Sequence, residues 1–219
     1  QNWGFPTYNW DKMAETNFTW WQQRLTVMRE YFDAYRLDHI LGFFRIWEIP
    51  NHSVRALLGQ FSPALGLTIE EIENNYHIPF SSWGGEERFV QPFIRDWVVR
   101  ELAGVYNDQI FAEFLESRGN GNYHFKAQYN TQKKIEAQVS DESLRNILLT
   151  LQANVLFLAD HRTPGLYHPR IKFMDTLSFR EFGDEQVKQN LMGLHNDYFY
   201  TRHNEFWKEK AYQKLPVIK

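Results

Sequence analysis

The segment Arg36-Leu37-Asp38-His39 places a guanidinium, a carboxyl group and an imidazole within four residues. In a strand, residues two apart project from the same face, so Arg36 and Asp38 would point the same way. A guanidinium beside a carboxyl group favours its ionised form through charge and hydrogen bonding. An ionised carboxylate at the end of a barrel strand suits a nucleophile. On spacing alone, an ordinary ion pair at a strand edge is the simpler interpretation.

Other chemistry finds little support in the sequence. The chain has no cysteine, which excludes disulfides, thiolate nucleophiles and Cys-ligated zinc. The eight histidines include no HExxH spacing, and His161 and His168, on either side of the turn at 163–165, are a weak zinc pair. No glycine-rich phosphate loop is present. We therefore expect neither a metal nor a cofactor.

The composition excludes several classes of protein. The chain has 219 residues, with 24 Lys and Arg against 27 Asp and Glu, so it carries no basic surface for nucleic acid. A hydrophobic content of 43% excludes a disordered chain. No apolar run approaches the roughly 18 residues of a membrane helix, so no membrane partner is expected. The absence of cysteine fits a reducing compartment, and we predict a cytoplasmic location.

The residues before Arg36 have the periodicity of an amphipathic helix. Apolar residues recur at alternating steps of three and four: Phe18, Trp21, Leu25, Met28 and Phe32. Thr16 or Asn17 is expected to cap this helix. The alternating segment 34–38 is β-compatible, and an apolar stretch from Ile40 to Ile49 follows it. A helix followed by a short strand is half of a βαβ unit.

The rest of the chain favours helices. A capping box is predicted at Thr68 to Glu71, and a helix that begins near Pro92 should stop at Gly104. Residues 119–122 form a loop. One long helix is predicted from Asp184 to about Gln213. We divide the chain into 1–52, which carries the strand with Asp38, a mainly helical part at 53–154, and 155–219.

Three ordered motifs in the first fifty residues resemble a known family. They are QNWGFPTYNW (1–10), WWQQRL (20–25) and YRLDHILGFFRIWEIP (35–50), and YHPRI (167–171) and the stretch 196–216 fit as well. They resemble the amylomaltase or disproportionating-enzyme family, the 4-alpha-glucanotransferases of glycoside hydrolase family 77. The form of the motifs is closest to the plant cytosolic disproportionating enzymes and their bacterial relatives. The middle of the chain, at about 70–154, is only loosely similar.

The resemblance implies roles for individual residues. Asp38 matches the catalytic nucleophile on the fourth barrel strand, and Arg36 matches the arginine that keeps this nucleophile ionised. His39 matches a histidine that contacts the bound sugar. Trp3, Tyr8 and Asn9 lie in the motif of the active-site rim. The implied substrate-binding residues are therefore His39, Trp3, Tyr8 and Asn9.

The implied fold class is α/β, a fragment of a (β/α)8 TIM barrel with a large helical insertion at 53–154. Because barrel strands without neighbours expose edges and apolar faces, we expect the isolated chain to be mainly α-helical. It would cover its barrel surface as a homodimer or by refolding these strands. The chain starts at Gln1 without Met, and we expect it to be an internal piece of a longer protein.

The implied reaction moves glucosyl or maltooligosaccharyl units between alpha-1,4-glucans, with maltose, maltooligosaccharides or alpha-glucan as ligands. Retention needs two carboxyl groups about 5–5.5 Å apart. The family's acid/base Glu is expected after Lys219, so the isolated chain should be inactive. Two alternatives stay open: an alpha-glucan hydrolase of the same fold, and a non-catalytic helical module that binds glucan or a partner protein.

Overall fold

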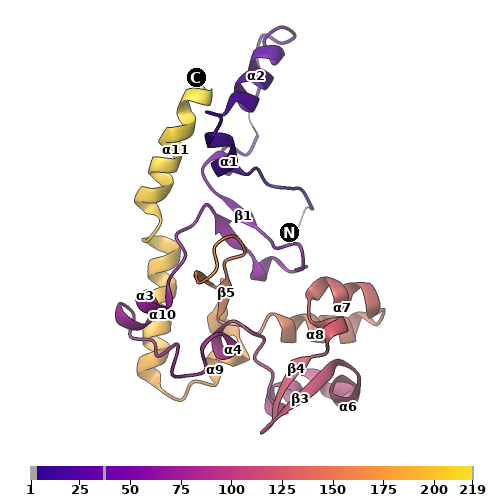
Figure 1. Cartoon of the computed structure of the whole chain (residues 1–219). Coiled ribbons are helices and arrows are strands. Elements are labelled where there is room, and N and C mark those ends of the chain that lie inside the picture. The colour runs from indigo at the N-terminus through magenta and orange to yellow at the C-terminus, as the bar shows by residue number, and fades with distance from the viewer. Residues whose placement is uncertain (1–3, 37, 219) are drawn as a thin grey trace.

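Two helices run end to end along one side of the molecule, in the computed structural model shown in Figure 1. They are α10 (Glu185–Tyr200) and α11 (Asn204–Ile218). Near the C-terminal end of α11 lie the first two helices of the chain, α1 (Trp10–Ala14) and α2 (Thr19–Met28). The structure describes residues 4–36 and 38–218.

The other elements are short. The helices are α3 (Ile69–Asn74), α4 (Gly85–Phe89), α5 (Asp96–Ala103), α6 (Asn107–Gln109), α7 (Gln132–Gln138), α8 (Glu142–Gln152) and α9 (Leu177–Arg180). The strands form three antiparallel pairs: β1 (Ile46–Glu48) with β2 (Gln60–Ser62), β3 (Leu115–Gly119) with β4 (Asn122–Phe125), and β5 (Phe157–Ala159) with β6 (Tyr167–Pro169). None of the helices within the described ranges is long and apolar enough to cross a membrane.

The prediction of a mainly helical chain is confirmed, whereas the strand predicted at 34–38 is wrong for the residues that the structure describes. Residues 34–36 have no regular structure and Asp38 lies in a bend. The sheets that are present are small, and no closed barrel occurs among the described residues. A barrel strand takes its backbone hydrogen bonds from neighbouring strands, so an alternating sequence without such neighbours does not form one.

Two hydrophobic cores hold most of the chain. The first lies in residues 93–151, where α5, α7, α8 and the β3–β4 hairpin bury a continuous set of aliphatic and aromatic side chains. The second joins residues 67–89 to residues 156–198, which are far apart in sequence, through Phe80, Phe89 and Phe157 among others. Burial of these side chains removes apolar area from water, which is the main favourable term in folding.

A buried asparagine and a stacked arginine connect the two cores. The Asn154 side chain donates from Nδ2 to the Phe93 carbonyl oxygen at 2.7 Å and accepts from the Ser178 amide at 2.9 Å. The Arg88 guanidinium lies between two aromatic rings, 4.4 Å from the centre of Phe93 and 4.2 Å from that of Phe182. Burial lowers the pKa of Arg88 to about 10. Below that pH the guanidinium stays charged and retains its cation–π contacts.

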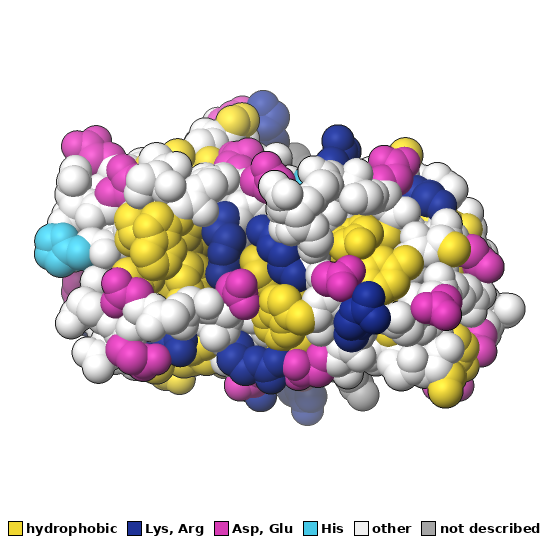
Figure 2. Space-filling model, turned by 90° about the horizontal axis from the view of Figure 1, so that it is seen from below, with side chains coloured by type: hydrophobic (Ala, Val, Ile, Leu, Met, Phe, Trp, Pro, Cys, Tyr) yellow, Lys and Arg dark blue, Asp and Glu magenta, His cyan; other side chains and the backbone are white. Residues whose placement is uncertain are grey.

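Figure 2 shows the face at the lower end of Figure 1, where hydrophobic side chains gather in separate patches with Lys and Arg side chains between them. Trp83 is an aromatic residue with 39% of its surface open to solvent. Its ring stacks on Phe182 with the ring centres 5.4 Å apart. Trp83 therefore adds an open ring to the aromatic stack that contains Arg88.

Several local predictions are confirmed. The Thr68 hydroxyl accepts from the Glu71 amide at 3.1 Å and the Glu71 carboxylate accepts from the Thr68 amide at 3.0 Å, which is a complete capping box. Gly104 follows the last residue of α5 with a positive φ of 54°, as expected, but this helix begins at Asp96 and not near Pro92. The loop at 119–122 is the turn of the β3–β4 hairpin, whose strands the sequence did not predict. The helix α2 has Phe18 rather than Thr16 or Asn17 at its N-cap.

The predicted helix from Asp184 is two helices, broken at residues 201–203. Asp184 caps α10 as expected, since its carboxylate accepts from the amides of Gln186 and Val187. The break has a tertiary cause. Arg202 donates to the carbonyl oxygens of Leu65 and Gly66, both at 3.0 Å, and these bonds hold the break between the two helices against the residues before α3.

His203, at the break, is buried, and we expect it to make the fold sensitive to acid. Burial lowers its pKa to about 4, against an ordinary value of 6.5. Between pH 6.5 and 4 the unfolded chain binds more protons than the folded chain, so stability is fully present above pH 6.5 and falls as the pH drops. We expect the isolated chain to lose roughly 2 kcal/mol from this group by about pH 4.5, measured by urea unfolding.

The variant His203→Gln should show a smaller loss of stability between neutral and acid pH than the unmodified chain. His77→Asn is the matched control, because His77 is exposed and already adopts a positive φ of 54°, which asparagine tolerates. Equal acid dependence in the two variants would contradict the assignment to His203.

Candidate active site

Arg36 and Asp38 form the ion pair that the sequence indicates. The Arg36 Nη2 atom donates to Asp38 Oδ1 at 3.0 Å. Both side chains are open to solvent, with 86% and 85% of their surface exposed. The guanidinium therefore lies against the carboxylate, and the second carboxylate oxygen is accessible to a substrate. Exposed pairs of this kind add little stability, so the pair has little structural value at this position.

His39 begins the turn that follows the ion pair. It adopts a left-handed conformation, with a φ of 52°, and its side chain is exposed. Its carbonyl oxygen accepts from the Gly42 amide at 2.8 Å and starts the 3-10 turn η1 (Ile40–Phe43). The backbone therefore changes direction at His39, between Asp38 and η1.

Tyr8 and Asn9 lie at the start of α1. The Asn9 side chain caps this helix, because its Oδ1 accepts from the Lys12 amide at 3.1 Å. Tyr8 is 45% exposed and its ring centre is 5.3 Å from that of Trp21. Trp3 lies outside the described residues. Asn9 therefore has a local structural role here, while the Tyr8 ring is accessible.

Trp10 connects the segment of Tyr8 and Asn9 to the turn after His39. Its ring is stacked on Trp21 with the centres 6.2 Å apart and lies 5.2 Å from the ring of Phe43, in η1. Trp21 is buried, so it packs the helix rather than offering its ring to solvent. Its neighbour Trp20 is 44% exposed and lies beneath the Arg24 guanidinium. The structure thus brings the two predicted site segments together through aromatic packing.

A buried carboxylate network, which no motif in the sequence indicates, also holds this region. Glu48, in β1, has only 10% of its side chain exposed. Its carboxylate accepts two bonds from Arg162, at 3.0 and 2.8 Å, and one from the Thr7 hydroxyl at 2.7 Å. Arg162 also donates to the Ser62 hydroxyl at 2.8 Å. The network ties the residues just before Tyr8 to β1 and β2.

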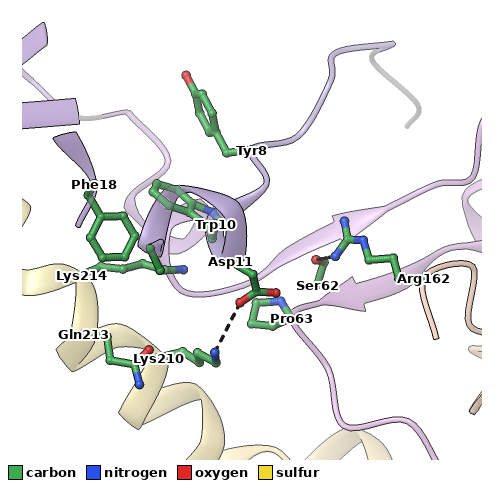
Figure 3. A pocket seen from close by; sticks show the side chains of 11 residues that line it. Tyr8, Trp10, Asp11, Phe18, Ser62, Pro63, Arg162, Lys210, Gln213 and Lys214 are labelled. Atoms are coloured by element: carbon green, nitrogen blue, oxygen red, sulfur yellow. Dashed lines mark hydrogen bonds and ion pairs between the residues drawn. The ribbon is translucent and has the colours of Figure 1, made fainter. Parts of the chain in front are cut away.

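Figure 3 shows a small pocket between α1, β2 and α11, with Tyr8 at its rim. Its charged lining residues come from different parts of the chain: Asp11, Arg162, Lys210 and Lys214. Lys210 pairs with Asp11 at 3.4 Å. Lys214 is buried, and its burial lowers the pKa to about 8. No signal in the sequence pointed to Lys214.

The described residues contain no group of three or more His, Cys, Asp or Glu side chains that would hold a metal ion. His168 is engaged elsewhere. Its Nδ1 is 2.5 Å from the Tyr198 hydroxyl and its Nε2 is 2.8 Å from the Asp160 carboxylate. Both ring nitrogens therefore have protein partners, which leaves His168 no free lone pair for a zinc ion shared with His161.

Comparison with known proteins places the chain in a family. Residues 1–219 match the profile of glycoside hydrolase family 77, described as 4-alpha-glucanotransferase. The chain is 38% identical over 229 residues to the 4-alpha-glucanotransferase DPE2 of Oryza sativa subsp. japonica, covering 100% of this chain and 24% of the rice protein. The chain thus spans about a quarter of the length of that relative.

Shorter similarities reach bacterial proteins of the same description. A 4-alpha-glucanotransferase of Chlamydia pneumoniae is 47% identical over 47 residues, which are 22% of this chain and 9% of that protein. One of Aquifex aeolicus is 39% identical over 69 residues, which are 32% of this chain and 14% of that protein. No solved structure matches the chain significantly. The match over all 219 residues shows that the chain belongs to the 4-alpha-glucanotransferases of glycoside hydrolase family 77.

Proposed function

We propose that this chain carries the nucleophile of a retaining 4-alpha-glucanotransferase that moves glucosyl or maltooligosaccharyl units between alpha-1,4-glucans. The observation that supports this most is the Arg36–Asp38 pair at 3.0 Å, in a chain whose whole length matches the family. A neighbouring guanidinium favours the anionic form of a carboxylate, and an exposed carboxylate is able to attack a bound sugar.

In the proposed reaction an Asp38 carboxylate oxygen attacks the anomeric carbon of a bound glucan. The bond from that carbon to the leaving sugar's oxygen breaks, and a second carboxyl group protonates the oxygen. The glucosyl ester on Asp38 is then displaced by the hydroxyl of an acceptor sugar, which gives its proton to the same second group. From the family resemblance, that acid/base is expected beyond Lys219, and the chain by itself is expected to be inactive.

The remaining site residues are proposed as sugar contacts. Tyr8 offers an exposed ring and His39 an exposed imidazole, on segments that pack together through Trp10. Asn9 and Trp3 are proposed from the resemblance. In the intact protein these groups would lie at the rim of a TIM barrel with residues 53–154 as a helical insertion. A homodimer and a cytoplasmic location stay predictions.

The fate of the glucosyl ester distinguishes the proposed transferase from a glucan hydrolase. In the intact protein incubated with maltotriose and isotopically labelled glucose, we expect label to enter longer maltooligosaccharides while the number of reducing ends stays constant. Transfer conserves reducing ends because each broken glucosidic bond is replaced by another. A rise in reducing ends that matches the bonds broken would instead assign a hydrolase.

A glucan-binding module is the second candidate, and the exposed Trp83 ring favours it. Aromatic faces bury large areas against flat apolar surfaces, and Trp83 is already held in place by Phe182. Glucan binding that is lost in Trp83→Ala and unchanged in Asp38→Asn would support this candidate. Binding that depends on Asp38 alone would exclude it.

A further inference from the structure

Lys214 contacts both segments that carry the predicted site residues. Its Nζ atom donates to the carbonyl oxygen of Phe43 at 2.6 Å, at the end of the η1 turn that starts after His39. The same atom lies 4.4 Å from the centre of the Trp10 ring, directly after Asn9. Lys214 belongs to α11, more than 170 residues along the chain from Phe43.

The Lys214 side chain is buried, unlike an ordinary surface lysine. Only 3% of Lys214 is exposed. Its charged neighbours are Asp11 from α1, Lys210 from its own helix, and Arg162, which lines the same pocket (Figure 3). The polar group that faces it from η1 is the Phe43 carbonyl oxygen. No carboxylate within 4–36 and 38–218 forms an ion pair with it, so the carbonyl dipole and the Trp10 ring are its direct partners.

We propose that Lys214 is a positioning residue for glucosyl transfer: its ammonium group holds the Trp10 segment against the η1 turn and so keeps Tyr8 and Asn9 in register with Asp38 and His39. The inference rests on the proposed function, because register matters only if these residues share a site. Misplacement of a reacting group by about 1 Å can cost about 100-fold in rate. One buried side chain that fixes both segments therefore has a large effect on the reaction.

The charge of Lys214 gives the role a pH signature. Burial and the nearby Lys210 lower its pKa to about 8 from an ordinary 10.5. Above pH 8 the neutral amine loses its attraction to the Trp10 ring and donates a weaker hydrogen bond to Phe43. Because the folded chain binds fewer protons than the unfolded chain between pH 8 and 10.5, this group's contribution to stability rises over that range. The contacts therefore loosen without a loss of stability.

The test compares Lys214→Met, Lys214→Arg and Lys208→Met in the intact protein. Lys208 is the matched control, because it lies on the same helix, is exposed and forms an ion pair with Glu205 on that helix. The readouts are kcat and KM for maltotriose from about pH 6.5 to 9.5, thermal unfolding at each pH, and tryptophan fluorescence. The fluorescence of Lys214→Met is subtracted from that of the unmodified protein, which isolates the Trp10 contact.

We expect the unmodified protein to lose kcat as the pH rises through about 8 while its unfolding temperature does not fall. Lys214→Met should lower kcat at neutral pH by about 10- to 100-fold, with a smaller change in KM and no decrease near pH 8. Lys214→Arg should keep most of the activity and also lack this decrease, because a guanidinium stays charged. Lys208→Met should behave like the unmodified protein.

Equal kcat and equal alkaline decrease in Lys214→Met and Lys208→Met would overturn the proposal. So would the absence of a fluorescence change near pH 8 in the difference signal, whatever the activity. A fluorescence change in a protein that transfers no glucose would show that the contact exists and would overturn the proposed function instead. These outcomes distinguish failure of the positioning role from failure of the proposed function.

Discussion

Asp38→Asn in the intact protein is expected to lower kcat for glucosyl transfer by about 10⁴-fold or more, as for the loss of a covalent nucleophile in other enzymes. The amide has the same size as the carboxylate but cannot form the ester with glucose. The folded state should be unaffected, because 85% of the Asp38 side chain is exposed and its ion pair adds little stability. The measurement is the rate of label transfer from maltotriose, with thermal unfolding as a check.

Asp33→Asn is the matched control, since Asp33 is an exposed aspartate five residues earlier in the same irregular segment. It should transfer at the unmodified rate. A second experiment locates the covalent intermediate by trapping it with a slow glucosyl donor and identifying the labelled residue by mass spectrometry. Label on another residue, or full activity in Asp38→Asn, would refute the assignment of the nucleophile.

The largest effect on stability is expected from His168→Ala, which should lower the free energy of unfolding by about 3–5 kcal/mol. His168 has 1% of its surface exposed and joins Asp160, before the turn at 163–165, to Tyr198 near the C-terminal end of α10. Its removal leaves the buried Tyr198 hydroxyl without this partner, weakens the bonding of Asp160, and opens a cavity. Urea unfolding of the isolated chain measures the loss.

The hydrogen bonds suggest which atoms carry the protons. An ionised Asp160 only accepts, so the His168 Nε2 donates to it, and Nδ1 then accepts from the Tyr198 hydroxyl. Tyr198→Phe removes one of these bonds and keeps the volume, so it should cost only about 1 kcal/mol. The exposed His161 provides the control. If His168→Ala were no more destabilising than His161→Ala, the network would have no structural importance.

The sequence by itself determined the features that depend on neighbouring residues. The capping box at Thr68, the N-cap at Asp184 and the turn at 119–122 each need only hydrogen bonds or backbone conformations within a few residues. The Arg36–Asp38 pair belongs to the same class, because its two members are two residues apart. The family resemblance likewise follows from contiguous motifs.

Only the tertiary structure decided the features whose partners are far apart in the chain. Lys214 meets Phe43 and Trp10, and Glu48 meets Arg162, across more than 100 residues. The pattern at 34–38 permits a strand, yet the described residues 34–36 and 38 form none, because a strand needs partners to accept its hydrogen bonds. A local pattern states what a segment is able to form, whereas distant packing decides which of these forms has the lowest free energy.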